Sequence, residues 1–325
     1  MKVLDWGVAA MGGVASNVLV RLPLAWRLGI MHSGNVVLTR FMQTQAFRNL
    51  YLDQNKAHRR QVEEVALDEI MTAVPDGQGQ QVSLFYSGGA DSTYSAYLLA
   101  QAFERVHLLS FTHDGIANLH KPKINSDRLK ARFGDKIVHH VIDGNDIWRR
   151  LYLAPFKQDL ARYGAFMNTG ACECCYLSWN AIAVVYNKRN SISNLAVGID
   201  RDHSGFMYSA TDEGIEAMRR FHADYGVRYF MPVYDEPQTD VKLYQLGITS
   251  EEHTKRPYQF YTTSTTQGTC EFGLGHRLYA QYAVVRDSSE ERQARANAYF
   301  GERLEVCRSF IDEALKQDIP ISYLA

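Results

Sequence analysis

The sequence contains no apolar run long enough to cross a bilayer. An acid, Asp5, lies near the N-terminus, and glycines interrupt the apolar stretch that follows, which disfavours a secretory signal. The chain has five cysteines, three of them within residues 172–175, and this clustering is not the framework of a disulfide-stabilised secreted protein. These absences predict a cytoplasmic protein that does not bind a membrane.

Neither sign of charge is in excess. The 325 residues include 35 basic and 36 acidic side chains, for a net charge of -1. A chain built mainly to wrap nucleic acid would be basic, so the charge gives no support to a nucleic-acid substrate. The sequence also lacks internal repeats and low-complexity tracts, and with 46% apolar residues it is typical of a globular protein of one large or two smaller domains.

Two common phosphate-binding patterns are missing, the Walker loop with its lysine and the Gly-x-Gly-x-x-Gly fingerprint. A different glycine loop is present instead. The short apolar run at residues 84–86 leads into Ser-Gly-Gly-Ala-Asp-Ser at 87–92, and a helical pattern follows at once. Glycines allow the sharp turn that joins a strand to a helix. Backbone N–H groups, small hydroxyls and a helix N-terminus then converge on one point, which favours an anion.

This loop resembles the PP-loop of the N-type ATP pyrophosphatases, a superfamily with an adenine nucleotide alpha hydrolase-like fold. The resemblance implies that the loop and Mg²⁺ hold the pyrophosphate end of ATP while a substrate oxygen attacks the α-phosphate. Asp91 would contact the metal, and the segment after the second strand would contact adenosine, although a solvated turn is an alternative for that segment. The residues expected to bind the nucleotide are Ser87, Gly88, Gly89, Asp91, Ser92, Thr93, Thr112, His113, Asp114 and Gly198.

Buried-type strands at residues 106–111, 136–142 and 193–197 alternate with helical patterns. This alternation predicts an α/β fold, a doubly wound parallel sheet with right-handed crossovers, whose ligand binds where the strand order reverses. A turn signal at residues 75–79 suggests two parts. We expect residues 1–79 to form a mainly helical N-terminal extension. Its role would be to cap the sheet, to shape the substrate mouth or to form a homodimer surface. Residues 80–325 form the PP-loop domain, which ends in a helix from about 289 to 316.

Cys172 and Cys175 have the Cys-x-x-Cys spacing that directs two thiolates at one metal, and Cys270 lies in a later glycine-bracketed loop. Three thiolates can hold a 4Fe-4S cluster with one open iron, and four can hold Zn²⁺. Cys174 and Cys175 are adjacent and cannot easily bind one ion together. We therefore expect Cys172, Cys175 and Cys270 as ligands and Cys174 as a reactive thiol; buried cysteines without a metal are the alternative, and Cys307 fits a helix face.

The cysteine arrangement resembles a branch of PP-loop enzymes that thiolate tRNA bases, where a Cys-x-x-Cys pair and a later cysteine form an iron–sulfur site. It also resembles the N-acetyl sugar amidotransferases, which use ammonia. The chain departs from the thiolases at residues 198–203, which replace their Gly-His-x-x-Asp-Asp, and it carries no recognisable RNA-binding module.

Together these patterns predict an ATP-dependent transferase or ligase that adenylylates a carbonyl or carboxylate oxygen of a small-molecule or nucleotide acceptor. Pyrophosphate leaves first and AMP later, when sulfur replaces the oxygen. Asp91 and Cys174 are the expected catalytic residues, with the sulfur carried on an open iron or as a persulfide on Cys174. Two alternatives remain: an ammonia-dependent amidotransferase with structural zinc, and a nucleotide-binding protein without catalysis.

Overall fold

The computed structural model describes residues 74–163, 167–201, 207–236, 239–249, 266–270 and 290–324. All of them belong to one structural unit. The helices expected in the N-terminal extension lie outside the described residues. The first described strand begins at Gly77, so the expected boundary at residue 79 falls inside that strand.

A six-stranded sheet forms the centre of this unit, in the order β6-β5-β1-β2-β4-β8. Neighbouring strands are parallel except for β8, which runs antiparallel to β4 at the edge. The strands are β1 (Gly77–Phe85), β2 (Phe103–Thr112), β4 (Ile137–Asp143), β5 (Asn194–Val197), β6 (Arg228–Phe230) and β8 (Tyr323–Leu324). The chain adds β2 and β4 on one side of β1, and then β5 and β6 on the other. The strand order therefore reverses between β1 and β5, which confirms the predicted doubly wound sheet.

The central strands are buried on both faces. In β2 the run Val106, Leu108 and Leu109 is fully buried, and so are Val82 and Leu84 of β1. Such continuous apolar runs are typical of parallel strands covered by helices on both sides.

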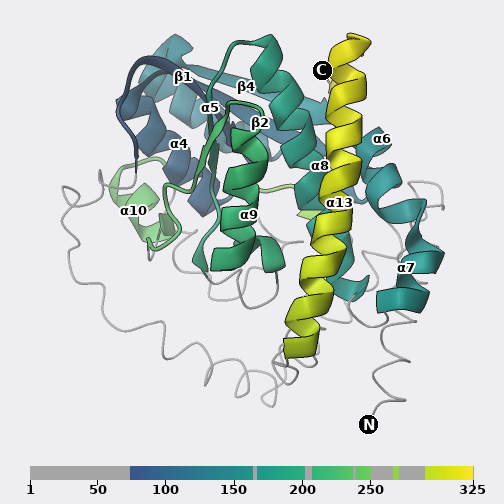
Figure 1. Cartoon of the computed structure of the whole chain (residues 1–325). Helices are drawn as coiled ribbons and strands as arrows, with labels where there is room; N and C mark the ends of the chain where they lie inside the picture. Colours follow the sequence, from purple (N-terminus) through teal and green to yellow (C-terminus); the bar gives the residue numbers. More distant parts are fainter. Residues whose placement is uncertain are drawn as a thin grey trace, which may run out of the picture. The chain divides into compact units, whose positions relative to one another are not determined.

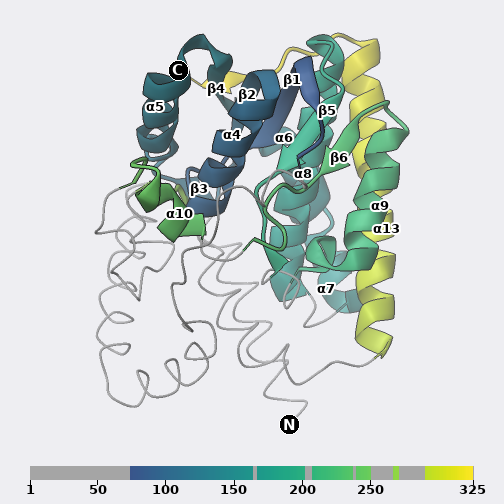
Figure 2. The same cartoon turned by 90° about the vertical axis from the view of Figure 1, so that its left-hand side faces the viewer.

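Helices cover both faces of the sheet, as Figure 2 shows. One face carries α4 (Ala90–Ala102), α5 (Pro122–Phe133) and α10 (Thr239–Gln245), which packs on α4. The other face carries α8 (Met167–Arg189), with α6 (Asn145–Trp148), α7 (Phe156–Tyr163) and α13 (Glu290–Lys316) packed on it. The helix α9 (Asp212–Ala223) packs on β6.

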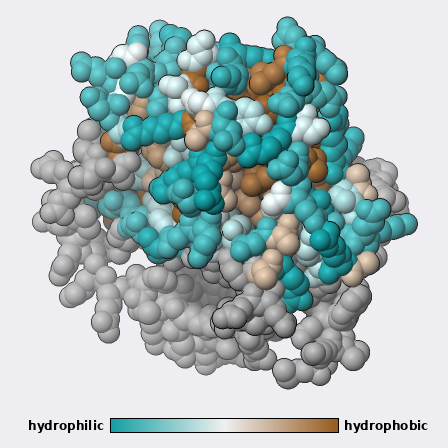
Figure 3. Space-filling model, viewed as in Figure 1, coloured by the Kyte–Doolittle hydropathy of each residue, from teal (hydrophilic) through white to brown (hydrophobic). Residues whose placement is uncertain are grey.

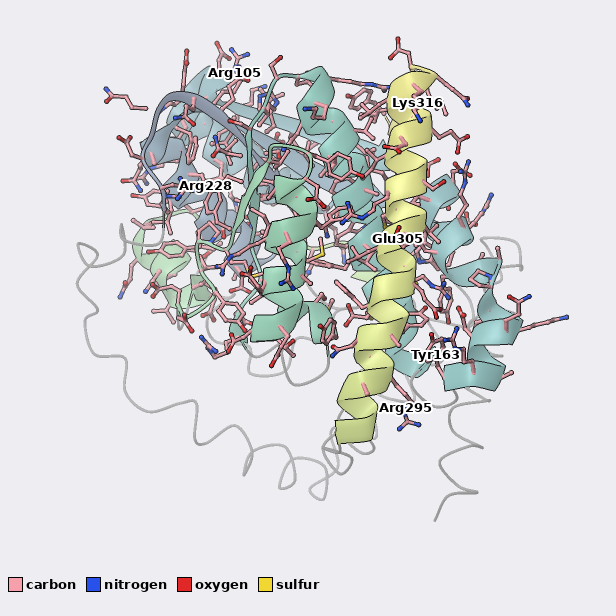
Figure 4. The ribbon with its side chains drawn as sticks, viewed as in Figure 1. Arg105, Tyr163, Arg228, Arg295, Glu305 and Lys316 are labelled. Carbon is pink, nitrogen blue, oxygen red and sulfur yellow. The ribbon has the colours of Figure 1, made fainter. Side chains whose placement is uncertain are left out.

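The last helix, α13, runs along α8 (Figure 1) and confirms the helix predicted from about 289 to 316. Its inner side buries Tyr299, Phe300 and Cys307. A buried ion pair also joins Arg303 of α13 to Asp159 of α7. Other polar side chains, among them the labelled Glu305 and Lys316, project from α13 in Figure 4.

A second, two-stranded ladder lies outside the main sheet. It joins β3 (Ile116–Ala117) to β7 (Thr269–Cys270) in antiparallel register, with Ile116 opposite Cys270. This pairing connects the segment after β2 with a part of the chain about 150 residues later. The sequence pattern did not predict it.

The face drawn in Figure 3 is mostly hydrophilic over the described residues, with small hydrophobic areas between polar ones. Within the described part of the chain, no helix has both the length and the apolar character that a membrane span requires.

Candidate active site

The glycine loop connects β1 to α4 at the point where the strand order reverses. Gly89 is the N-cap of α4, so the cap offers no side chain of its own to the first N–H groups of the helix. The hydroxyls of Ser87 and Ser92 lie 3.1 Å apart, and the N–H of Gly89 donates to the Ser87 hydroxyl at 3.2 Å. Helix N–H groups and two hydroxyls thus gather at one point, which is the arrangement that binds an anion such as phosphate.

Two neighbouring helices hold this loop in place. From α5, the buried Asn125 donates its side-chain N–H to the carbonyl oxygen of Gly88 at 3.0 Å. From α10, the hydroxyl of Thr239 donates to the carboxylate of Asp91. Thr93 is fully buried behind the loop, within 3.5 Å of the hydroxyl of Tyr86. The Thr93 hydroxyl is therefore part of the core that supports the loop and is covered from solvent.

Two glycines are required where the loop meets other backbone. Gly88 has a φ of +79°, and a Cβ there would lie 2.2 Å from the carbonyl oxygen of Thr266. Gly198, which follows β5, would place a Cβ only 2.5 Å from the Cα of Ser92. Gly198, just after β5, and Thr266, in the 266–270 segment, therefore lie directly against the loop. No side chain fits at either contact without displacing backbone.

The segment after β2 is tied to the start of α6. The carbonyl oxygen of Thr112 accepts the N–H of Gly144 at 2.8 Å, and the N–H of Asp114 donates to the side-chain oxygen of Asn145 at 2.8 Å. The carboxylate of Asp114 forms an ion pair with Arg149. Thr112 and Asp114 lie at the carboxyl end of their strand, where the resemblance expects adenosine.

His113, between these two residues, is buried against Trp148 and Cys175. Its ring is 3% exposed and stacks on Trp148, with the ring centroids 4.2 Å apart. Its Nε2 lies 3.2 Å from the Sγ of Cys175, and burial lowers the pKa of His113 to about 3. The imidazole is therefore neutral at physiological pH. It faces the cysteine cluster, which does not favour the adenosine contact expected from the sequence.

The three clustered cysteines lie within the helix α8. Because α8 begins at Met167, residues 172–175 fall on its second and third turns. Cys172 and Cys175 are three residues apart, share one face of the helix and are both half-buried. This face can present two thiols to one ion.

Cys174 occupies a different environment. Its side chain is fully buried, donates to the carbonyl oxygen of Leu151 at 3.3 Å and lies 3.0 Å from the hydroxyl of Tyr299 on α13. Burial raises the pKa of the Cys174 thiol to about 12, and the Tyr299 hydroxyl only partly offsets this. A neutral, enclosed thiol is a poor nucleophile. These surroundings disfavour the reactive role that we expected for Cys174.

The backbone of Cys270 lies on the same side as His113. Ile116, which pairs with Cys270, donates its N–H to the carbonyl oxygen of His113 at 2.9 Å. The fold thus brings the third expected ligand to the segment that contacts Cys175, although the Cys270 side chain is outside the described residues. Among the described side chains, no three potential ligands converge on one ion.

Glu173 anchors the segment that contains Tyr208 and Ser209. Its buried carboxylate accepts the backbone N–H groups of Tyr208 and Ser209, and burial raises the pKa of Glu173 to about 7. Sequence reasoning did not select Glu173, Asn125 or Thr239, because a single polar residue on a helix carries no spacing signal.

The loop at the switch point is a candidate anion site, and Cys172 and Cys175 on α8 are a candidate thiol pair. A scan against protein families finds no match, and a search of curated proteins finds none either. Solved structures do show likeness. A predicted tRNA methyltransferase subunit from Methanocaldococcus jannaschii has a TM-score of 0.36 and 17% identity, over 50% of this chain and 72% of the other.

The U34-tRNA thiolase NcsA from Methanococcus maripaludis, with its 4Fe-4S cluster, has a TM-score of 0.39 and 13% identity, over 73% of this chain and 76% of the other. The NMN synthetase from Francisella tularensis has a TM-score of 0.38 and 15% identity, over 74% of this chain and 90% of the other. Likeness at this level carries no argument about the activity of this chain.

Proposed function

We propose that the chain is an AMP-forming PP-loop enzyme that adenylylates a carbonyl or carboxylate oxygen and exchanges that oxygen for sulfur. The observation that carries this proposal is the course of residues 266–270. One end of this segment lies against Gly88 of the loop, and the other pairs with β3 beside the cysteine face. Five residues span at most about 14 Å, so the anion site and the third cysteine are close enough to serve one substrate.

The loop residues bind the β- and γ-phosphates of ATP. Backbone N–H groups at the start of α4 and the hydroxyl of Ser87 would donate to these phosphates, and the buried Ser92 hydroxyl, which donates to the carbonyl oxygen of Gly89, supports Ser87. Thr239 orients the carboxylate of Asp91 for the metal contact. Mg²⁺, when bound, neutralises charge on the phosphate oxygens and on the leaving pyrophosphate. Because Gly198 has no side chain, the end of β5 can approach Ser92 of the loop closely.

The chemistry has two steps with a balanced exchange of bonds. In the first, an acceptor oxygen forms a bond to the α-phosphorus while the bond to pyrophosphate breaks. In the second, a sulfur nucleophile forms a bond to the activated carbon, and AMP leaves with the original oxygen. The preorganised N–H groups stabilise the negative charge that develops on the phosphates during the first step.

Cys172 and Cys175, with Cys270, are the residues that would hold a metal centre. Three thiols, two of them half-buried on one helix face, would suit a 4Fe-4S cluster with an open iron, whereas Zn²⁺ would take a fourth ligand as well. A cluster would supply a place for the sulfur, whereas zinc would serve structure and favour ammonia as the nucleophile. The acceptor is a small molecule or a nucleotide.

The test is turnover of ATP with Mg²⁺ and either sulfide or ammonia, on protein purified without oxygen. We expect pyrophosphate and AMP, with mass spectrometry of screened acceptors showing an oxygen-to-sulfur exchange. Asp91→Ala should abolish pyrophosphate release, whereas the exposed Asp127→Ala on α5 should not change it. Zinc without iron, with oxygen-to-nitrogen exchange, would support the amidotransferase instead. Absence of pyrophosphate release in every condition would contradict the proposal.

A further inference from the structure

The activation step proposed above does not use the contact between His113 and Cys175. Its geometry is fixed from two sides. The His113 ring lies nearly parallel to Trp148, at an interplanar angle of 6°, and both rings are buried. The ring edge that carries Nε2 points at the Cys175 sulfur, 3.2 Å away.

The neighbouring backbone decides which nitrogen carries the proton. The N–H of Gly115 donates to Nδ1 of His113 at 3.0 Å. A nitrogen that accepts a hydrogen bond presents its lone pair, so in a neutral imidazole the proton lies on Nε2. His113 is therefore the donor toward Cys175, and the sulfur is the acceptor.

This arrangement is the reverse of that in a metal-binding histidine. A ligating imidazole usually donates an N–H from one nitrogen to an oxygen and presents the lone pair of the other to the metal. In His113 the nitrogen far from the cysteine receives a hydrogen bond instead. The geometry thus excludes His113 as a direct ligand in this arrangement, although it lies at the cysteine face.

We propose that His113 is a positioning residue that holds the Cys175 sulfur through an Nε2–H···S hydrogen bond. The inference rests on the cysteine centre of the proposed function and adds a residue to it. Hydrogen bonds to ligand sulfurs orient them and adjust the electronic properties of the metal they bind. The adjacent Cys174 has no such role, since its sulfur is enclosed between Leu151 and Tyr299.

Two variants separate hydrogen bonding from packing. His113→Gln keeps an N–H donor at the position of Nε2 but loses the ring that stacks on Trp148. His113→Phe keeps a stacking ring but has no donor. Both lose the acceptor for Gly115, so that cost is common to the pair. The probe is Co²⁺, titrated into the reduced full-length chain without oxygen and followed by thiolate-to-cobalt absorption.

We expect the glutamine variant to bind Co²⁺ with nearly the affinity of the original chain, and the phenylalanine variant to bind at least 10-fold more weakly. Equal affinities in all three proteins, equal weakening of both variants, or a weaker glutamine than phenylalanine variant would each overturn the role of His113. If the original chain binds no Co²⁺, the cysteine centre fails together with this inference. Pyrophosphate release by the same sample then shows whether the ATP-dependent part still stands.

Discussion

Gly88 offers the sharpest mutational test of the loop. Its φ of +79° lies in the left-handed region, where a residue with a side chain costs about 1–2 kcal/mol. A Cβ at this position would also lie 2.2 Å from the Thr266 carbonyl oxygen and 2.6 Å from the Cα of Pro122. Both contacts are with backbone, so no rotamer change relieves them. Gly88→Ala must therefore displace either the loop or the segment that covers it.

The expected effect on activity is large. A displacement of about 1 Å in groups that position reacting atoms can lower the rate by about 100-fold, and we expect a loss of at least that size in pyrophosphate release. Gly79 supplies the matched control. It has a similar φ of +71°, but an added Cβ meets nothing within 4 Å. Gly79→Ala should lose about 1–2 kcal/mol of unfolding free energy in urea and keep its activity. Normal turnover in Gly88→Ala would refute the assigned role of the loop.

Three further predictions concern the rest of the unit. Cys174→Ser should keep pyrophosphate release and oxygen exchange within about twofold, since that thiol is enclosed and neutral; loss of exchange alone, seen by mass spectrometry, would restore its reactive role. Arg303→Met should lower the unfolding free energy in urea by about 3–5 kcal/mol, because Asp159 is left buried without its partner. His222 is fully buried, and burial lowers its pKa to about 3. The unfolded chain therefore takes up a proton near pH 6.5 that the folded chain does not. Lowering the pH from 7 to 5 should therefore reduce the unfolding free energy of the original chain by about 2 kcal/mol more than that of His222→Gln. Urea unfolding at the two pH values measures this, and an equal reduction in both proteins would contradict it.

The sheet could be predicted from the sequence because its signals are local. Buried strands such as residues 106–111 show continuous apolar runs, and the Ser-Gly-Gly loop marks the turn into α4. The helix α13, which ends at Lys316, is long enough for its helical pattern to be recognised in the sequence alone. The edge strand β8 has only two residues, Tyr323 and Leu324, and its pairing with β4 leaves no periodic signal.

The site could be predicted only in part. The Cys-x-x-Cys spacing marks Cys172 and Cys175 as a pair, but it does not show that all three clustered cysteines lie inside one helix, α8. Which cysteine is enclosed depends on Tyr299, 125 residues later. The inward turn of His113 likewise depends on stacking with Trp148. Contacts over such distances in the chain are set by packing and carry no spacing pattern.

The central claim is that ATP is cleaved between its α- and β-phosphates. The most direct measurement is ³¹P NMR of the products formed from ATP and Mg²⁺ by the full-length chain in the presence of an accepted substrate. The account predicts AMP and pyrophosphate in equal amounts, with both signals absent in Asp91→Ala. Formation of ADP and inorganic phosphate would contradict it.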